Sequence, residues 1–389
     1  RQMCIRDRGN VVAALLASGA LLLPATAAGQ ADATRSNFEG VIQGLNDNSF
    51  ERFNRAIDRK SLTARIYSNR IIEPDVKKSF SSDFNGSIQQ MYVSSFPKSK
   101  KEIVGKVIGY ERKGDSARAV VRFESSGYRY SFHVYDLTID GRGRPAIVDW
   151  MDYYQGGRFS DEAGAALVMA MPSKPATRNM LKNKNLGEGQ LFQVGELFKA
   201  VRDNKGERFF QIYDGLDDVL RSEPVVVRLN LQLALSMRDT ERAAAAVDTM
   251  LDTYADDGTH SLRLIEYYIP TRQYDKAIAT LTRLQDLLGV EEGAIDSLKA
   301  SAAMAMGDIE VAEKYALAAV SAEPSLEVAW WSLLRVRTRA EDYAGATEAL
   351  ARLEDDFGHT LHANKLRKDR FLKVLAEQQA FLDWRAARD

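Results

Sequence analysis

The carboxyl-terminal half of the chain repeats one pattern of apolar and polar positions at nearly constant spacing. A small residue returns at Ala243, Ala277, Ala312 and Ala346, which are separated by 34, 35 and 34 residues. Each alanine lies three residues after the first residue of a predicted amphipathic helix. A recurring alanine indicates that two helices cross closely there, because a larger side chain would force them apart. We therefore predict stacked helix pairs over residues 190–358.

Residues that stop helices follow these alanines at a matching distance. Pro324 lies 12 residues after Ala312, and Gly289 and Gly358 occupy the same place in two other units. Proline lacks the backbone donor that a continuing helix needs, and glycine readily adopts the left-handed conformation that ends one. The stretch 191–221 carries a weaker form of the pattern, so we predict a degenerate first helix pair there.

This period and this alanine pattern resemble the tetratricopeptide repeat (TPR), a helix pair of 34 residues. The resemblance implies an all-α solenoid of roughly five repeats, in which the first helices of successive pairs line a concave groove. Residues 359–389, with apolar positions from Leu366 to Trp384, look like a C-terminal capping helix that covers the last repeat.

A different pattern occupies residues 36–160. Apolar residues at helical spacing predict helices before Pro97, and alternation of apolar and polar residues predicts strands after it. We therefore predict an α+β domain with a four-strand antiparallel sheet, placed before the all-α solenoid. The helices are expected at 38–45, 50–57 and 76–91, and the strands at 103–112, 117–124, 128–139 and 146–154.

The second predicted strand has two distinct faces. Ala119, Val121 and Phe123 point one way, while Arg122 and Glu124 point the other way. This alternation predicts a sheet with one buried and one wetter face. The order of helices and strands resembles the cystatin-like, nuclear-transport-factor-like class, which implies that a bent sheet wraps the helices into a cone.

Two segments flank these domains. Residues 161–189 are predicted as a helix and a linker, since two prolines stop the helix and a polar, glycine-containing stretch follows. Residues 1–30 are predicted as a secretory signal peptide, because the apolar run Val11–Leu23 precedes small residues. That run spans roughly 20 Å, which is short of a bilayer core, and the alternative is an uncleaved membrane anchor. We set residues 1–8 aside as an artefact of the sequence.

Charge and cysteine content exclude several classes of protein. The 389 residues include 53 basic and 54 acidic side chains, so no net field draws the chain to nucleic acid. A single cysteine, Cys4, allows neither an internal disulfide nor a thiolate metal cluster. The sequence also contains no nucleophile elbow, phosphate loop or dinucleotide fingerprint. We therefore expect neither a cofactor nor enzymatic activity.

Histidines are the remaining candidates for chemistry. His359 and His362 could share a helical face as metal ligands, but no third ligand is tied to them by spacing, so no metal site is predicted. His133 lies within one predicted strand and Asp149 within the next. If both face the hollow of the cone, they could form an acid–base pair or line a small-molecule pocket. The alternative is an ordinary sheet histidine with an aspartate that faces water.

The TPR resemblance also implies groove positions, which can be counted back from the anchor alanines. An exposed tryptophan beside two arginines at helical spacing suits a peptide or an acidic segment, through stacking and charge-assisted hydrogen bonds. In the alternative, the tryptophan packs on the capping helix or on the α+β domain, and the arginines form a solvated face. The groove positions are Arg228, Gln232, Leu262, Glu266, Trp331, Arg335 and Arg339.

Together these patterns predict a non-catalytic, periplasmic or secreted scaffold that binds a protein or peptide partner, with no membrane span after signal cleavage. One alternative is a small-molecule binder or a weak hydrolase or isomerase that uses the cone of the α+β domain. Another is a subunit of an envelope assembly whose groove is filled by its own α+β domain. This last alternative predicts a large buried area between residues 36–160 and the solenoid.

Overall fold

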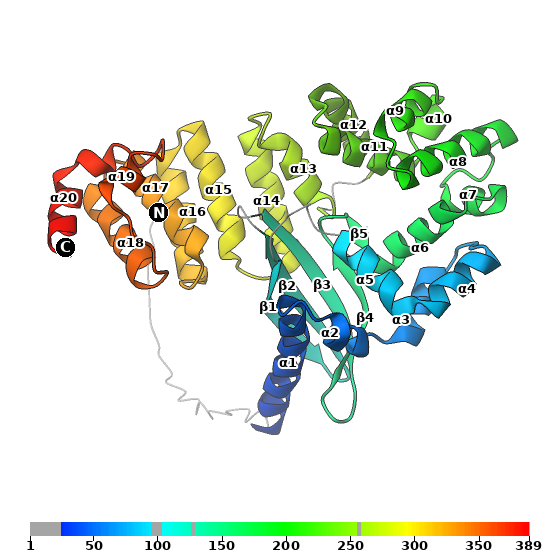
Figure 1. The fold of residues 1–389 in the computed structure, drawn as a ribbon, viewed down its shortest axis with the longest axis horizontal. Helices are drawn as coiled ribbons and strands as arrows, with labels where there is room; N and C mark the ends of the chain where they lie inside the picture. Colours follow the sequence, from blue (N-terminus) through cyan, green and yellow to red (C-terminus); the bar gives the residue numbers. More distant parts are fainter. Residues whose placement is uncertain (1–24, 95–102, 126–128, 255–257, 389) are drawn as a thin grey trace, which may run out of the picture.

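The computed structural model describes residues 25–94, 103–125, 129–254 and 258–388 (Figure 1). Most of the predicted signal peptide over 1–30 lies outside these residues. Within the described ranges, no helix is both long and apolar enough to cross a membrane. The described chain begins with helices, continues into an antiparallel sheet and ends in a long run of helices.

Helices precede the sheet, and their boundaries follow local capping. The side chain of Asp58 accepts a hydrogen bond from the backbone N–H of Ser61 and begins a helix that the apolar pattern did not reveal. The Asp83 carboxylate accepts one from the backbone N–H of Gly86, 3.2 Å away, so the helix predicted at 76–91 is two helices. The helices are α1 (Ala25–Asn46), α2 (Phe50–Ala56), α3 (Arg59–Tyr67), α4 (Pro74–Ser82) and α5 (Phe84–Ser94).

The sheet is an antiparallel meander in the order β1-β2-β3-β4-β5. The predicted count of four strands is wrong, because the chain turns at Gly156 and a two-residue strand pairs with the end of β4. Gly156 has a φ of 79°, which favours glycine in this tight turn. The strands are β1 (Val104–Lys113), β2 (Ser116–Ser125), β3 (Arg129–Ile139), β4 (Pro145–Asp152) and β5 (Gly157–Arg158).

One face of the sheet packs on the preceding helices. Ala119, Val121 and Phe123 point into this core, as the alternation predicts. Trp150 on β4 is completely buried in the same core and stacks on Phe159, with 3.9 Å between ring centroids. The interior of the α+β domain is therefore filled largely by aromatic side chains.

Two helices follow the sheet, α6 (Phe159–Ala170) and α7 (Lys174–Met180). Leu167 of α6 and Ala176 of α7 are buried in the core of the α+β domain. The segment 161–189, predicted as a helix and a linker, thus contains helices that pack on the preceding sheet and helices. Where one domain ends within this segment stays a prediction.

From residue 188 to residue 355 the described chain is a helical repeat of the TPR-like kind. Four pairs, from α11 with α12 to α17 with α18, follow a looser group of three helices. The helices are α8 (Glu188–Arg202), α9 (Gly206–Asp214), α10 (Asp218–Arg221), α11 (Pro224–Met237), α12 (Thr240–Thr253), α13 (Ser261–Tyr268), α14 (Tyr274–Leu288), α15 (Gly293–Met306), α16 (Ile309–Ala322), α17 (Glu327–Arg339) and α18 (Tyr343–Asp355).

The second helix of each of these pairs begins three residues before its anchor alanine. An aspartate side chain caps the first turn of α12, α16 and α18 by accepting a backbone N–H, which stabilises that boundary. Gly289 ends α14 with a φ of 66°, in the left-handed conformation. The anchors are exposed by 2% or less: Ala243, Ala277, Ala312 and Ala346.

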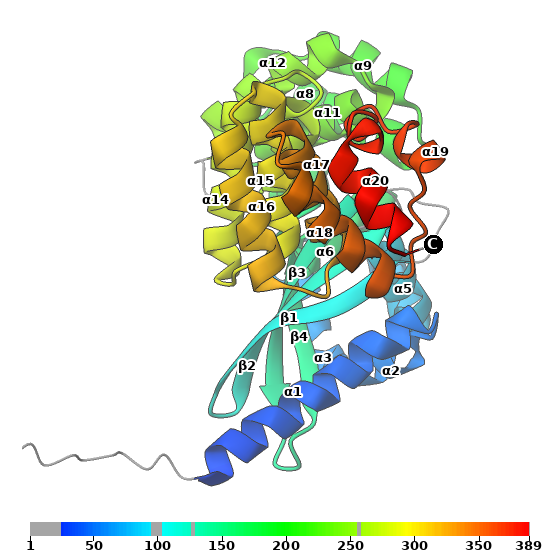
Figure 2. The same ribbon diagram turned by 90° about the vertical axis from the view of Figure 1, so that its left-hand side faces the viewer.

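The solenoid forms an arch, and the sheet lies under its centre (Figure 1). In the perpendicular view, the sheet lies between the helices α14 to α18 and α1 (Figure 2). Phe132 and Val134 on the outer face of β3 are buried against Leu284 and Leu288 of α14. The prediction of a wetter face is wrong for this sheet, since Arg122 on the outer face is only 4% exposed.

The sheet meets the solenoid largely at helix ends. The guanidinium of Arg118 donates to the backbone carbonyls of Leu287 and Leu288, each at 3.0 Å, where α14 ends. Gly109 on β1 approaches the next loop so closely that a β-carbon there would lie 2.6 Å from Cγ1 of Val290. The domains are therefore packed firmly together at this edge.

The segment 359–389, predicted as a capping helix, is broken into short elements. Asp369 turns the chain, since its carboxylate accepts a hydrogen bond from the backbone N–H of Phe371 at 2.8 Å. Leu366 and Phe381 still bury themselves against the last repeat, so the segment covers that repeat without being one helix. Its elements are α19 (Ala363–Leu366), the 3-10 helix Leu375–Glu377 and α20 (Gln379–Ala386).

Candidate functional site

A pocket opens at the carboxyl-terminal end of the solenoid, between α17 and the segment that follows α18. Its volume is about 380 Å³. We call it the terminal pocket. It is lined by Glu327, Trp331, Arg335, His359, Leu361, Lys365, Leu366, Asp369 and Leu372.

Trp331 is held in one orientation by two neighbours. Its indole Nε1 donates to Oε1 of Glu327, one helical turn earlier, at 2.8 Å. The same carboxylate oxygen lies 2.7 Å from Nε2 of His359, and the rings of Trp331 and His359 meet edge to face at 5.3 Å. The tryptophan is half-buried, so one part of its surface remains open to the pocket.

Arg335 lies beside Trp331, because residues four apart share one face of a helix. Its guanidinium carbon is 5.8 Å from the centre of the Trp331 ring, and Nη2 is 3.2 Å from Oδ2 of Asp369. Lys365 adds a second cation to the lining. An aromatic wall beside an arginine and a lysine is chemistry that suits an acidic or aromatic peptide side chain.

The other predicted groove positions lie elsewhere. Arg228 on α11 forms an ion pair with Glu162 of α6, and Glu266 on α13 forms one with Arg263 at 3.2 Å. Gln232 is half-buried on α11, Leu262 is buried near the sheet, and Arg339 is exposed at the end of α17. The structure therefore brings Trp331 and Arg335 together, and it turns Arg228 toward the α+β domain.

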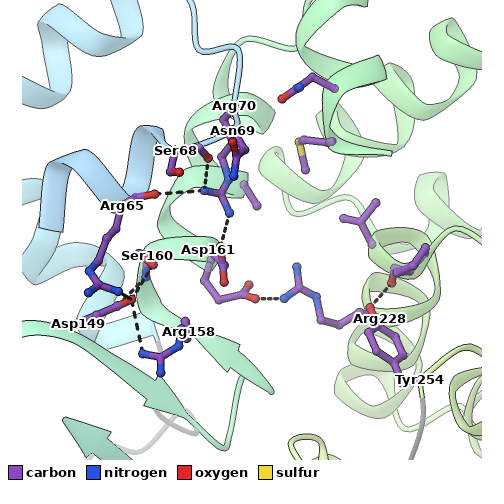
Figure 3. Close-up of a pocket in the computed structure, with 16 residues that line it drawn as sticks. Arg65, Ser68, Asn69, Arg70, Asp149, Arg158, Ser160, Asp161, Arg228 and Tyr254 are labelled. Carbon is purple, nitrogen blue, oxygen red and sulfur yellow. Dashed lines mark hydrogen bonds and ion pairs between the residues drawn. The ribbon is translucent and has the colours of Figure 1, made fainter. Parts of the chain in front are cut away.

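A second cavity of about 500 Å³ lies between the α+β domain and the solenoid (Figure 3). We call it the arginine cleft. Its charged lining consists of Arg65 from α3, Arg70 from the segment after α3, Asp149 from β4, Arg158 from β5, Asp161 and Glu162 from α6, and Arg228 from α11.

Two of these arginines hold the walls of the cleft in place. Arg70 pairs with Asp161 and also donates to backbone carbonyls at the end of α3, including that of Ser68 at 3.1 Å. Arg228 pairs with Glu162 across the domain boundary. Burial lowers the pKa of Arg228 from its usual value, which reflects how far this guanidinium is withdrawn from water.

Asp149 is the buried centre of the cleft. Ser160 donates to it twice, from its hydroxyl at 2.7 Å and from its backbone N–H at 3.1 Å. Burial raises the pKa of the Asp149 carboxyl, and the hydrogen bonds from Ser160 only partly offset that effect. Arg65 and Arg158 approach the same Oδ2 from two sides, at 4.0 and 3.8 Å (Figure 3).

His133 and Asp149, the predicted acid–base pair, are not brought together. His133 is paired in the sheet with Asp152, and its Nε2 lies 3.5 Å from Oδ2 of that residue. Its Nδ1 lies 3.1 Å from the hydroxyl of Tyr135, whose pKa burial raises well above its ordinary value. His133 is completely buried, whereas Asp149 lines the arginine cleft.

Metal-binding chemistry is not evident in the described part of the chain, where no three His, Cys, Asp or Glu residues form a group that could hold an ion. His359 contacts Glu327 and Trp331. Three arginines of the cleft, Arg65, Arg70 and Arg158, are not among the predicted site residues, because they share no spacing with one another or with Arg228. Only the tertiary structure assembles them.

Neither the protein-family models nor the curated proteins include a match to this chain. Among solved structures it is similar to MamA (residues 41 to the end) from Desulfovibrio magneticus RS-1, to a MamA RS-1 ArsTM double mutant, and to PilW, a type IV pilus biogenesis factor. Each is 15% identical, and the TM-scores are 0.37, 0.36 and 0.35 in that order. Both MamA matches cover 44% of this chain, together with 97% of the MamA chain that begins at residue 41 and 96% of the double mutant. The match to PilW covers 52% of this chain and 93% of the PilW chain.

Likenesses this distant carry no argument about function. The class of protein rests instead on the chain's own helices, which form pairs at the TPR period with a buried alanine in each second helix. The fold is a TPR-like helical repeat joined to a five-strand α+β domain.

Proposed function

We propose that this chain is a non-catalytic, extracytoplasmic scaffold that binds a peptide segment of a protein partner in the terminal pocket. The observation that carries the proposal is the pairing of Trp331 with Arg335 on one face of α17, at the wall of an open pocket. Helical repeats bind partners through extended surfaces, and aromatic and arginine side chains dominate such interfaces.

The lining of the terminal pocket supports a partner segment with acidic and apolar residues. Arg335 and Lys365 offer donors to a carboxylate, while Leu361 and Leu372 offer apolar contact. The terminal pocket is favoured over the upstream part of the predicted groove, because Arg228 pairs with the α+β domain and is less available to a partner.

An extracytoplasmic location is supported by the apolar run Val11–Leu23 and the small residues after it. In fractionated cells, we expect the chain outside the cytoplasm and its amino terminus near residue 30. Mass spectrometry of the purified chain checks this, and recovery of full-length protein from the cytoplasm would contradict it. The order of α1 and an antiparallel meander also supports a cystatin-like class for the α+β domain.

The binding proposal is tested by co-purification from the envelope fraction and identification of the partner. A folded double variant, Trp331→Ala with Arg335→Ala, should lose the partner, with a dissociation constant weakened by roughly tenfold or more. Arg352→Ala is the matched control, since Arg352 lies on α18 of the same repeat and its side chain is 60% exposed. An unchanged partner set in the folded double variant would contradict the proposal.

The alternative of a small-molecule site or a weak hydrolase or isomerase inside the cone gains no specific support. His133 is completely buried, and Phe123, Tyr135 and Trp150 fill the space on the same side of the sheet. The near balance of basic and acidic residues likewise favours a protein partner over nucleic acid.

A further inference from the structure

The arginine cleft contains guanidinium groups that the protein itself leaves largely unused. Arg65 donates no hydrogen bond from its guanidinium to any described residue, and its one ion pair, with Asp149, is 4.0 Å long. That distance exceeds the 2.7–3.2 Å of an N–H···O hydrogen bond. Because a guanidinium has five N–H donors, Arg65 can donate several hydrogen bonds to a ligand.

Arg158 faces Arg65 across the same carboxylate. Its Nη1 donates to Oδ2 of Asp136 at 2.5 Å, and it lies 3.8 Å from Oδ2 of Asp149. Asp149 in turn takes its hydrogen bonds from Ser160 and from the backbone N–H of Trp150. Two arginines therefore converge on a carboxylate that does not consume their donors.

The composition of the cleft favours an anion. Four arginines line it against three carboxylates, and two of those carboxylates, Asp161 and Glu162, are already paired with Arg70 and Arg228. The remaining polar lining consists of the neutral side chains of Ser68, Asn69, Ser160, Asn179 and Tyr254. Arg65 and Arg158 are the most exposed arginines of the cleft, with side chains 48% and 44% exposed. Arg158 is paired with Asp136, whereas the carboxylate near Arg65, that of Asp149, lies 4.0 Å away.

The size of the cleft indicates a ligand larger than a single inorganic ion. Its volume of about 500 Å³ falls within the range of small-molecule sites, roughly 300–1,000 Å³. Ala165, Met180, Pro224 and Val225 add apolar side chains to the lining. The cleft also lies between two domains, which is a common place for such sites.

We propose that the arginine cleft binds a small organic molecule through an oxyanion group, a carboxylate or a phosphate, seated between Arg65 and Arg158. The planar fork of a guanidinium matches both groups by two parallel hydrogen bonds. The organic body of the ligand lies toward Met180 and Val225. This site is separate from the terminal pocket and does not depend on peptide binding there.

The test measures binding of three probes with the same ring to the full chain by isothermal titration calorimetry. Phenyl phosphate and benzoate carry the two oxyanions, and phenol carries none. We expect at least one oxyanion probe to bind while phenol does not. Binding of phenyl phosphate alone assigns a phosphate ligand, and binding of benzoate alone assigns a carboxylate. If neither oxyanion probe binds, or if phenol binds equally well, the proposal is overturned.

Substitutions then locate the site. Arg65→Gln and Arg158→Gln should each weaken the bound probe by about tenfold, because each removes a charge-assisted pair of hydrogen bonds. Arg55→Gln is the matched control, since Arg55 lies on α2 of the same domain, is 69% exposed and pairs only with Glu51 at 3.3 Å among described residues. Circular dichroism checks that each variant is folded. Wild-type affinity in both folded cleft variants also overturns the proposal.

Discussion

Arg122 on β2 and Glu292 at the start of α15 form an ion pair with almost no access to solvent, at 4% and 1% exposure. Arg122 also donates to Glu323, with 2.6 Å between Nη1 and Oε2, so one side chain joins the sheet to the start of α15 and the end of α16, the two helices of one repeat. Glu292 in addition caps α15 by accepting the backbone N–H groups of Ala294 and Ile295. Arg122 is therefore one of the side chains, together with Arg118, that join the sheet to the solenoid.

Replacing Arg122 by methionine should strongly destabilise the protein. Arg122→Met leaves the buried carboxylate of Glu292 without its cation, and breaking one side of a buried pair costs about 3–5 kcal/mol in the free energy of unfolding. Urea denaturation at pH 7 measures this loss. Lys113→Ala, at a side chain 81% exposed on β1, is the control and should change little.

The loss in Arg122→Met should shrink as the pH falls. Burial raises the pKa of Glu292 even with Arg122 present, so the folded state binds the proton more readily than the unfolded state does. A carboxyl with a raised pKa stabilises the folded state increasingly as the pH falls through that pKa. A deficit that grows toward low pH would contradict this explanation.

The anchor alanines should not tolerate larger side chains. Ala277→Leu forces a bulky group between two closely packed helices, which should cost about 1–3 kcal/mol in the free energy of unfolding. Ala279→Leu, two residues further along α14 and exposed, is the matched control. Thermal unfolding followed by circular dichroism compares the two. Equal melting temperatures would show that the alanine does not set the helix separation.

Glu354 should fasten the C-terminal segment to the last repeat. Its Oε1 accepts hydrogen bonds from the backbone N–H of Leu361 and from Nη1 of Arg385, both at 2.7 Å. Glu354→Gln weakens these charge-assisted bonds and should cost about 1–3 kcal/mol. Hydrogen exchange in α20 should speed up, whereas Glu348→Gln, at an exposed side chain of α18, should leave it unchanged.

This stabilisation depends on pH in a definite direction. Burial raises the pKa of Glu354, but the hydrogen bonds from Leu361 and Arg385 outweigh it, so the pKa lies below its ordinary value. The contribution is therefore complete above the pKa of the unfolded chain and is lost as the pH falls through the folded pKa. Wild type and Glu354→Gln should differ most near pH 7 and converge in acid.

Anion binding in the arginine cleft should strengthen as the pH falls toward the pKa of Asp149, which burial raises. Protonation removes one negative charge that faces Arg65 from α3 and Arg158 from β5, and that lies opposite Asp136 of β3, the carboxylate paired with Arg158. Benzenesulfonate is the suitable probe, since its own charge is constant. Asp149→Asn should bind it more tightly at pH 7 and remove the pH dependence. A pH profile unchanged in this variant would contradict the assignment to Asp149.

The repeat and the strands could be predicted from local patterns in the sequence. The starts of the second helices could be predicted from a buried alanine and its neighbours, because capping and helical periodicity act within a few residues. The inward face of β2, with Ala119 and Phe123, followed from alternation for the same reason. Trp331 and Arg335 could be paired in advance, since they lie one turn apart on one helix.

Contacts between distant segments could not be predicted in this way. Arg122 has the sequence pattern of a solvent-facing residue, and only the packing of the sheet on the solenoid buries it against Glu292. The arginine cleft likewise draws Arg65 and Arg158 from elements far apart in the chain.

The sequence by itself determined the helix period, the strand alternation and the terminal Trp331–Arg335 pair, because each depends on neighbours along the chain. The tertiary structure decided which faces are covered and which charges meet. Burial and ion pairing depend on how whole domains pack, and the local pattern of residues along the sequence does not specify that packing.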